Sequence, residues 1–294
     1  MKRVFFAFLV LALSFASVSF AQTDEEENSS STPVSKSTFL IEEAKIKEIL
    51  KSDMIMVEGD RRYRLGDILI PVDYDTLVVN HLEDLLHAKK VKIYGTKTKL
   101  YANALEEIDV DRYNIPLVNL ILEGGTWVQA DLVQSGMAMV YNIEGFGSDR
   151  MKMLLEMEET ARKDKQGFWS NPLYEVKTPE NVKDFTNSFQ VVEGRVSYAT
   201  AKKNKTYINF GRDWKTDFTL EVQSSDWSNF YPDPKLYDVA MWQGKLLRVR
   251  GWVQEKNGPM IEINNKDQIE FSKTAPPKDA SDKTEPSKTA PLKK

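Results

Sequence analysis

The sequence predicts an α+β protein in which strands dominate: a five-stranded barrel with packed helices, followed by a second, smaller barrel. Two observations predict this class. Short β-prone runs separated by Gly, Asn and Asp turns recur along the chain, as they do in small barrels. Amphipathic helical patterns interrupt these runs only in the first half of the chain.

The first domain is expected over residues 39–170. Its elements, in order, are expected as strands at 44–50, 54–57 and 62–70, a helix at 76–89, strands at 91–94 and 117–122, a helix at 128–135, a strand at 137–141 and a helix at 149–165. Glu58-Gly59-Asp60 supplies a hairpin turn between the second and third strands. Strands closed by turns, with a helix between the third and fourth, are typical of an OB-type barrel.

The helices of this domain follow from apolar spacing and from their stop signals. In the first helix, the leucines at 77, 82, 85 and 86 lie close to one face. Gly136 ends the second helix and Gly167 ends the charged third helix.

A linker is expected over residues 171–188, where Pro172 and Pro179 lie among polar residues. A second domain follows over residues 189–271. Its strands are expected at 191–198, 206–210, 218–222, 246–253 and 260–263, with an Asn257-Gly258 hairpin turn between the last two. This pattern predicts a second small barrel of the OB-like kind.

Residues 1–21 differ in kind from the rest of the chain. They combine Lys2 and Arg3 with an apolar stretch and the small-residue pattern Ser19-x-Ala21, which predicts a cleavable signal peptide. The apolar stretch is shorter than the ~20 residues that span a bilayer. We therefore expect an exported protein, periplasmic or secreted, with no membrane span after cleavage.

Two segments have the composition of disordered chain. Residues 22–38 are acidic and Ser-rich, and residues 272–294 are rich in Lys and Pro. We expect a disordered leader and a disordered tail. An alternative for the tail is a cationic arm that touches an anionic surface.

The composition limits the chemistry available to the protein. The chain has no Cys, which excludes disulfides, thiolate metal sites and Cys nucleophiles. It has 40 basic and 44 acidic residues, and removing Lys2 and Arg3 leaves 38 against 44, a formal charge of −6. Non-specific binding of nucleic acid depends on cationic contacts to phosphate, so any such site must be a local patch.

Five segments of the first domain occur in the order found in one known family. They are residues 53–59 with Tyr63-Arg64-Leu65 and Pro71, residues 85–93, Asp111-Arg112-Tyr113-Asn114, Leu132-Val133-Gln134-Ser135-Gly136, and Gly167-Phe168-Trp169-Ser170. With these segments the domain resembles the thermonuclease-like (staphylococcal nuclease-like) family. The second domain resembles the OB-like modules found behind such domains in exported bacterial proteins.

The resemblance implies calcium-dependent cleavage of phosphodiester bonds, and the site can be compared residue by residue. In that family two carboxylates hold Ca²⁺, a Glu positions or deprotonates water, and two arginines stabilise the phosphate charge. Asp53 matches the first metal carboxylate and Arg64 the first arginine. Leu69 and Val72 occupy the positions where the family has its second metal carboxylate and its Glu. Asn114-Ile115-Pro116 replaces the segment that carries the second arginine.

Losing a positioned acid or base typically costs 10²–10⁴ in rate, so the resemblance implies a degenerate nuclease with little activity. On that interpretation Asp53 caps a turn and Arg64 forms an ordinary salt bridge, and no cofactor is expected. The alternative is a divergent Ca²⁺-dependent nuclease, acting on DNA or RNA, that has rebuilt its site with Asp73, Asp75 or Glu58. That alternative needs a shifted strand register.

The second domain carries candidate binding residues. The strand around residues 246–252 alternates Arg248, Arg250 and Trp252 with apolar residues, which predicts a cationic, aromatic face. Because OB barrels bind single strands with basic grooves and stacking aromatics, we expect nucleic-acid binding by Tyr207, Trp214, Arg248, Arg250 and Trp252. The alternative is that the tryptophans pack in the core or between domains and that the arginines pair with Asp213 and Asp217.

The sequence thus favours a non-catalytic scaffold or binding protein of a Gram-negative periplasm, whose partner is single-stranded nucleic acid or a protein. A module that binds only protein is the third hypothesis, and the salt dependence of binding would separate it from the first.

Overall fold

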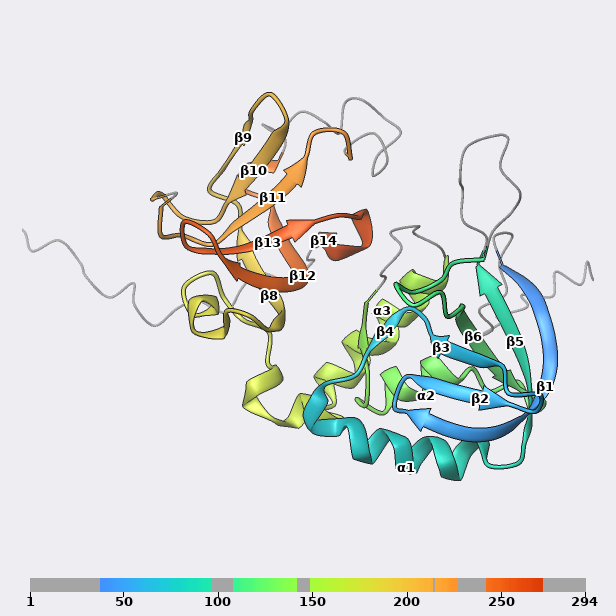
Figure 1. Cartoon of the computed structure of the whole chain (residues 1–294). Coiled ribbons are helices and arrows are strands. Elements are labelled where there is room, and N and C mark those ends of the chain that lie inside the picture. The colour runs from blue at the N-terminus through green and yellow to red at the C-terminus, as the bar shows by residue number, and fades with distance from the viewer. Residues whose placement is uncertain (1–37, 97–107, 142–148, 214, 227–241, 272–294) are drawn as a thin grey trace, which may run out of the picture. The chain divides into compact units, whose positions relative to one another are not determined.

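The structure is a computed structural model that describes residues 38–96, 108–141, 149–213, 215–226 and 242–271. The first half contains β1 (Thr38–Lys51), β2 (Met54–Val57), β3 (Arg62–Leu65), β4 (Ile68–Leu69), η1 (Val72–Tyr74), α1 (Asp75–Leu86), β5 (Lys90–Thr96), β6 (Leu117–Leu122), α2 (Val128–Gln134), β7 (Met139–Val140) and α3 (Asp149–Lys163). Figure 1 shows this half as strands accompanied by helices, which confirms the predicted α+β class.

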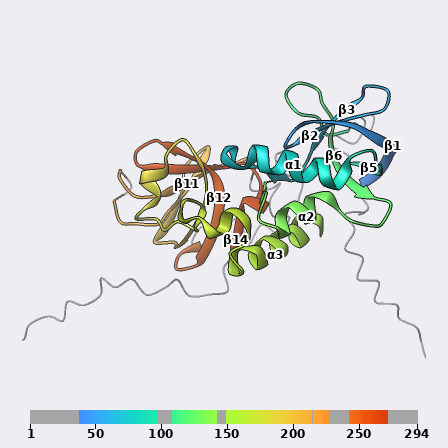
Figure 2. The same ribbon diagram turned by 90° about the horizontal axis from the view of Figure 1, so that it is seen from below.

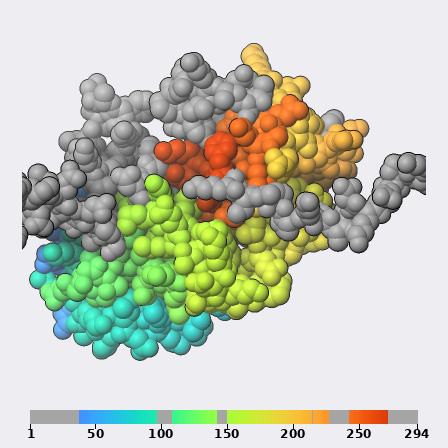
Figure 3. All heavy atoms as spheres, turned by 180° about the vertical axis from the view of Figure 1, so that it is seen from behind, coloured from blue at the N-terminus to red at the C-terminus, as the bar shows by residue number. Residues whose placement is uncertain are grey.

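Strands β1-β2-β3-β6-β5 close into the first barrel. All neighbours are antiparallel except β3 and β6, which run parallel and place Arg64 opposite Leu117. Burial alternates along β5, where Ile93 is fully buried, whereas every residue of β6 is buried; Ile55 and Leu120 are also fully buried in this core. From α1, Val78, Leu82 and Leu86 join the same core, whereas Leu77, which was expected on that face, is 48% exposed. Packed α2 and α3 lie side by side in Figures 1 and 2, and their green to yellow-green atoms gather on one face in Figure 3.

The third predicted strand, residues 62–70, is divided in the structure. Asp67 adopts a positive φ of 65°, which ends β3 and lets β4 pair with β7 instead. The buried Asp67 carboxylate accepts hydrogen bonds from Arg150 Nε at 3.0 Å and Asn119 Nδ2 at 3.1 Å. These distant partners hold a backbone conformation that a non-glycine residue seldom adopts.

The Gly-aromatic-Trp-Ser segment forms η2 (Gly167–Ser170), which packs against the end of α2. Gly167 has a φ of 51°, and a Cβ there would lie 2.1 Å from the carbonyl oxygen of Gly136. Glycine is therefore required at this close approach of two backbones, which explains its place in the segment.

The second sheet contains β8 (Phe189–Arg195), β9 (Tyr198–Ala201), β10 (Lys205–Asn209), β11 (Thr219–Gln223), β12 (Leu246–Glu255), β13 (Pro259–Ile263) and β14 (Ile269–Phe271), with short 3₁₀ turns η3 (Pro172–Tyr174), η4 (Val182–Phe185) and η7 (Lys266–Gln268) beside it. Its order is β14-β12-β13-β11-β10-β9, and β8 also pairs with β12. Strand β11 runs parallel to β13. Asn257 and Gly258 both have positive φ at the hairpin between β12 and β13, which confirms the predicted turn.

The strand predicted at 191–198 is two strands, β8 and β9, and β14 was not predicted. In the part of the chain that the structure describes, no helix has the length and apolarity needed to cross a membrane. The predicted signal peptide, most of the leader, Trp214 and the Lys/Pro-rich tail lie outside the described residues.

Candidate functional site

The two site positions that the sequence predicted in the first barrel contact each other. Asp53 lies in the turn between β1 and β2, and Arg64 lies on β3, opposite Met54. Arg64 Nη1 lies 2.5 Å from Asp53 Oδ2. Arg64 Nε lies 2.9 Å from Asp111 Oδ2, so one guanidinium bridges two carboxylates. The sequence placed Asp111 in the loop before β6 but did not reveal its pairing with Arg64.

The Asp111 carboxylate is fixed from both sides. Its Oδ1 accepts hydrogen bonds from the backbone N–H groups of Tyr113 and Ile115, at 2.8 and 2.9 Å. Burial raises the pKa of Asp111, but these two donors and the charge of Arg64 outweigh it and hold the pKa below its usual range. Asp111 is therefore an anion that occupies one side of Arg64.

Leu69 and Val72 have different surroundings from each other. Leu69, on β4, pairs with Met139 and packs beside the cluster that contains Phe168 and Trp169. Val72 begins η1 and is 88% exposed. Neither side chain carries an oxygen that could hold a cation or accept a proton.

The acids considered for a rebuilt site have other partners or lie exposed. Asp75 accepts a hydrogen bond from Ser52 Oγ. Asp73 Oδ2 accepts one from the hydroxyl of Tyr174 at 3.2 Å. Glu58 is exposed at the hairpin between β2 and β3.

The donor set around Asp53 does not fit a calcium ion. Ca²⁺ takes six to eight oxygen ligands. Within the described ranges, no three His, Asp or Glu side chains group together in the manner of a metal site. The carboxylates of Asp53 and Asp111 have the guanidinium of Arg64 between them.

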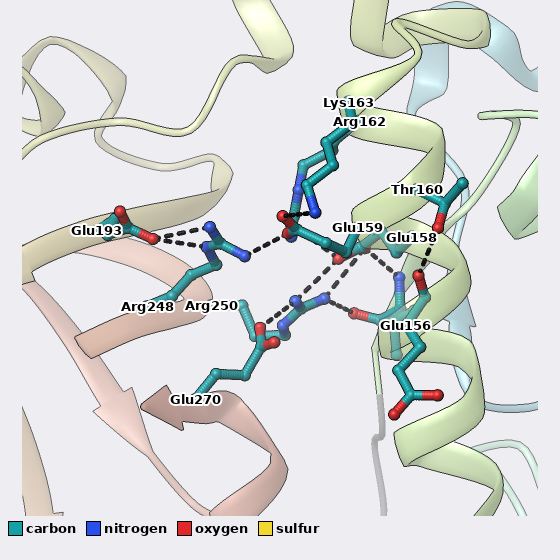
Figure 4. Close-up of polar contacts among 11 residues, drawn as sticks. Glu156, Glu158, Glu159, Thr160, Arg162, Lys163, Glu193, Arg248, Arg250 and Glu270 are labelled. Carbon is teal, nitrogen blue, oxygen red and sulfur yellow. Dashed lines mark hydrogen bonds and ion pairs between the residues drawn. The ribbon is translucent and has the colours of Figure 1, made fainter. Parts of the chain in front are cut away.

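Two of the candidate residues on β12, Arg248 and Arg250, face α3 and neighbouring strands (Figure 4). Arg250 Nη2 lies 2.9 Å from Glu158 Oε2 and 2.7 Å from Glu270 Oε1. Its Nη1 donates to the carbonyl oxygen of Val140 at 2.9 Å. Arg250 is 2% exposed, so the expectation of a free cationic face is corrected at this residue, because α3 and β7 cover it.

Arg248 is paired in the same way. Its Nη1 lies 2.5 Å from Glu159 Oε2, and its Nη2 lies 2.8 Å from Glu193 Oε2. The partners of both arginines are thus glutamates of α3, β8 and β14, not the Asp213 and Asp217 considered from the sequence. Arg162 also binds Glu158 and Glu159, which makes the cluster continuous along α3.

The electrostatics of the cluster favour the ionised forms of Glu158 and Glu159. Burial raises the pKa of Glu158, but the charges of Arg250 and Arg162 outweigh that effect and lower it. Burial opposes the charged form of Arg250 as well, yet Glu158 and Glu270 raise its pKa. Burial raises the pKa of Glu159, but Arg162 and Arg248 outweigh that effect and lower the pKa to about 2.

The remaining candidates do not join this cluster. Trp252 is 49% exposed, with its ring centroid 6.1 Å from that of Phe189. Tyr207 is half-buried on β10. The structure therefore does not gather the described candidates on one surface, and their binding of nucleic acid stays a prediction.

Comparison with known proteins identifies the framework of the first half. Residues 79–171 match the family model described as staphylococcal nuclease homologue. No curated protein matched the chain. The matched residues run from α1 to the end of η2 and begin after Asp53, Arg64, Leu69 and Val72. The chain therefore contains a staphylococcal nuclease-like domain and is thermonuclease-like in this part.

Proposed function

We propose that this protein is an exported, non-catalytic relative of the thermonucleases, which binds a polymer or protein partner and does not cleave nucleic acid. The observation that carries the proposal is the bridge from Asp53 through Arg64 to Asp111. Phosphodiester cleavage needs fixed cations that are free to meet the charge developing on phosphate. Here the retained arginine is already neutralised by two carboxylates.

The replaced positions support the same proposal. Leu69 and Val72 supply neither a second metal carboxylate nor a base, and a missing base alone typically costs 10²–10⁴ in rate. The family match also begins only at residue 79, after the segment in which these positions lie. The matched residues hold β5, β6, α2 and α3, whereas strands β1 to β3 and the replaced positions Leu69 and Val72 lie before them.

Cleavage of single-stranded DNA and RNA by the purified protein, with Ca²⁺ or with a chelator, tests the loss of catalysis. We expect no cutting above the chelated sample. Asp53→Ala tests the retained carboxylate, and Asp60→Asn, an exposed acid paired with Lys47, is the matched control. Calcium-dependent cutting that Asp53→Ala removes and Asp60→Asn preserves would overturn the proposal in favour of a rebuilt nuclease.

Export is proposed from residues 1–21. Mass spectrometry of the protein in a periplasmic or secreted fraction is expected to find a chain that begins at Gln22. Recovery of the uncleaved chain from the cytoplasm would contradict this part of the proposal.

A further inference from the structure

The second sheet has a hollow on its outer face, away from its apolar core. Along β10 and β11, Ile208 and Leu220 point inward and are fully buried. The alternate residues Asn209 and Glu221 point outward, yet they are only 3% and 2% exposed. Because successive side chains of a strand point to opposite faces, these polar residues lie on the outer face, and neighbouring side chains shield them from solvent.

The hollow is a cavity of about 500 Å³. Its lining includes Tyr198, Lys202, Tyr207, Asn209, Glu221 and Lys256. These residues come from β9, β10, β11, the turn between β9 and β10, and the β12–β13 hairpin; Figure 1 shows these strands next to one another. The volume is that of a small-molecule or single-residue binding site.

The floor of the cavity is polar and fixed. The Glu221 carboxylate receives hydrogen bonds from Lys205 Nζ and, at 3.0 Å, from Lys256 Nζ. Burial raises the pKa of Glu221, but the two lysines outweigh it and keep the carboxylate charged. Asn209 Oδ1 accepts from Thr219 Oγ1 at 3.0 Å, which fixes the Asn209 amide at the cavity.

The rim supplies positive charge and aromatic rings. Two lysines, Lys202 and Lys256, line the cavity, and Glu221 is the single carboxylate among the described lining residues. Glu221 also forms an ion pair with Lys205. Glu262 is level with Glu221 on β13 but is not part of the lining. Tyr198 and Tyr207 lie on adjacent strands, and both are half-buried. Planar rings bounded by cations are the means by which OB barrels bind single strands.

We propose that this cavity binds single-stranded nucleic acid, with a base stacked on Tyr207 and phosphates near Lys202 and Lys256. The inference rests on the proposed function, because it places at this site a polymer that the protein holds uncut. An acidic peptide would use the lysines but would leave the tyrosine rings and the Asn209 amide without a matching group. A duplex would keep its bases stacked away from the tyrosines.

Fluorescence anisotropy with a labelled oligo(dT) of about 12 nucleotides tests the site, since an OB fold covers roughly 4–16 nucleotides. Tyr207→Ala is expected to weaken binding roughly 5- to 150-fold, the loss of one stacked base. Tyr207→Phe keeps the ring and is expected to bind like the unchanged protein. Lys202→Ala is expected to reduce the slope of log affinity against log salt by about 0.7, one phosphate contact.

The matched control is Lys266→Ala, which removes an exposed lysine of η7 outside the cavity lining and should change neither affinity nor slope. Circular dichroism checks that each variant is folded. Because Lys202 is exposed, its variant keeps the test valid even if Tyr207→Ala unfolds.

Three outcomes would overturn the site. The first is that the unchanged protein does not bind the oligonucleotide. The second is that the Tyr207→Ala and Lys202→Ala variants bind it as tightly as the unchanged protein does. The third is that the protein binds a poly-Glu peptide more tightly than oligo(dT). Failure of the proposed function has a separate readout, because it would appear as shortened probe on a denaturing gel. An uncut probe that does not bind would overturn this inference alone.

Discussion

The first barrel and the second sheet share one strand order but use it differently. If β8 and β9 are taken as one bent strand, interrupted only at Val196-Ser197, both have the order first-second-third-fifth-fourth, with the third and fifth strands parallel. Each also carries an arginine that bridges two carboxylates. Arg64 lies between Asp53 and Asp111, and Arg250 lies between Glu158 and Glu270.

The two bridges differ in burial. The Arg64 side chain is 21% exposed, and its partners Asp53 and Asp111 are 29% and 10% exposed. Arg250 and Glu158 are 2% and 0% exposed, and Glu270 is 24% exposed. Charges near solvent are screened and contribute little, but a buried charge that loses its partner is costly. An arginine that bridges two carboxylates can therefore contribute little to stability in the first barrel and be a structural requirement in the second sheet.

Arg250→Ala gives the largest expected effect. Its loss leaves Glu158 buried with Arg162 and the Val140 N–H group as its remaining partners among the described residues. Breaking a buried pair from one side typically costs about 3–5 kcal/mol, and we expect a loss of that size in the free energy of unfolding. Chemical denaturation followed by circular dichroism measures it.

Arg64→Ala is the matched change in the first barrel. Because Arg64 and Asp53 are partly exposed and Asp111 keeps two backbone N–H donors, we expect a loss of about 1 kcal/mol or less. If Arg64→Ala and Arg250→Ala lowered the free energy of unfolding by similar amounts, burial would not determine how much such a bridge stabilises the protein.

The sequence predicted most strands and helices of both halves because these elements depend on patterns among neighbouring residues. Alternation in the strand with Ile93, leucine spacing in α1 and the Asn257-Gly258 turn each depend on neighbouring residues. The same patterns could not reveal the break at Asp67. Its positive φ is held by Asn119 and Arg150, which are 52 and 83 residues away.

The candidate sites were less accessible to sequence for the same reason. Alternation along β12 correctly predicted that Arg250 lies on the other face of the strand from the apolar residues. It could not predict its partner Glu158, which is 92 residues away. For Asp53 and Arg64 the family resemblance supplied the positions, and only the fold supplied Asp111. The hollow around Glu221 depends on four strands together, and no single strand carries a signal for it.

The smallest expected effect is a pH dependence in the cluster around Arg248. The pKa of Glu159 lies at about 2 in the folded protein, below its ordinary value of 4.5. A carboxyl whose pKa is lowered by folding contributes stability above its unfolded pKa and loses it as the pH falls toward the folded pKa. The contribution of Glu159 should therefore be complete above pH 4.5 and should fade toward pH 2.

Glu159→Gln isolates this contribution from those of the other acids. The unfolding free energy of the unchanged protein should exceed that of the variant near pH 6, and the difference should close as the pH falls toward 2. Glu156→Gln is the control, because Glu156 lies on the same helix, is exposed and points away from the arginines in Figure 4. A Glu159→Gln difference that stays constant across this range would mean that Arg162 and Arg248 do not hold the carboxylate as an anion. The ion bridges of the second sheet would then resemble the exposed pairing of Arg64 more closely than their burial implies.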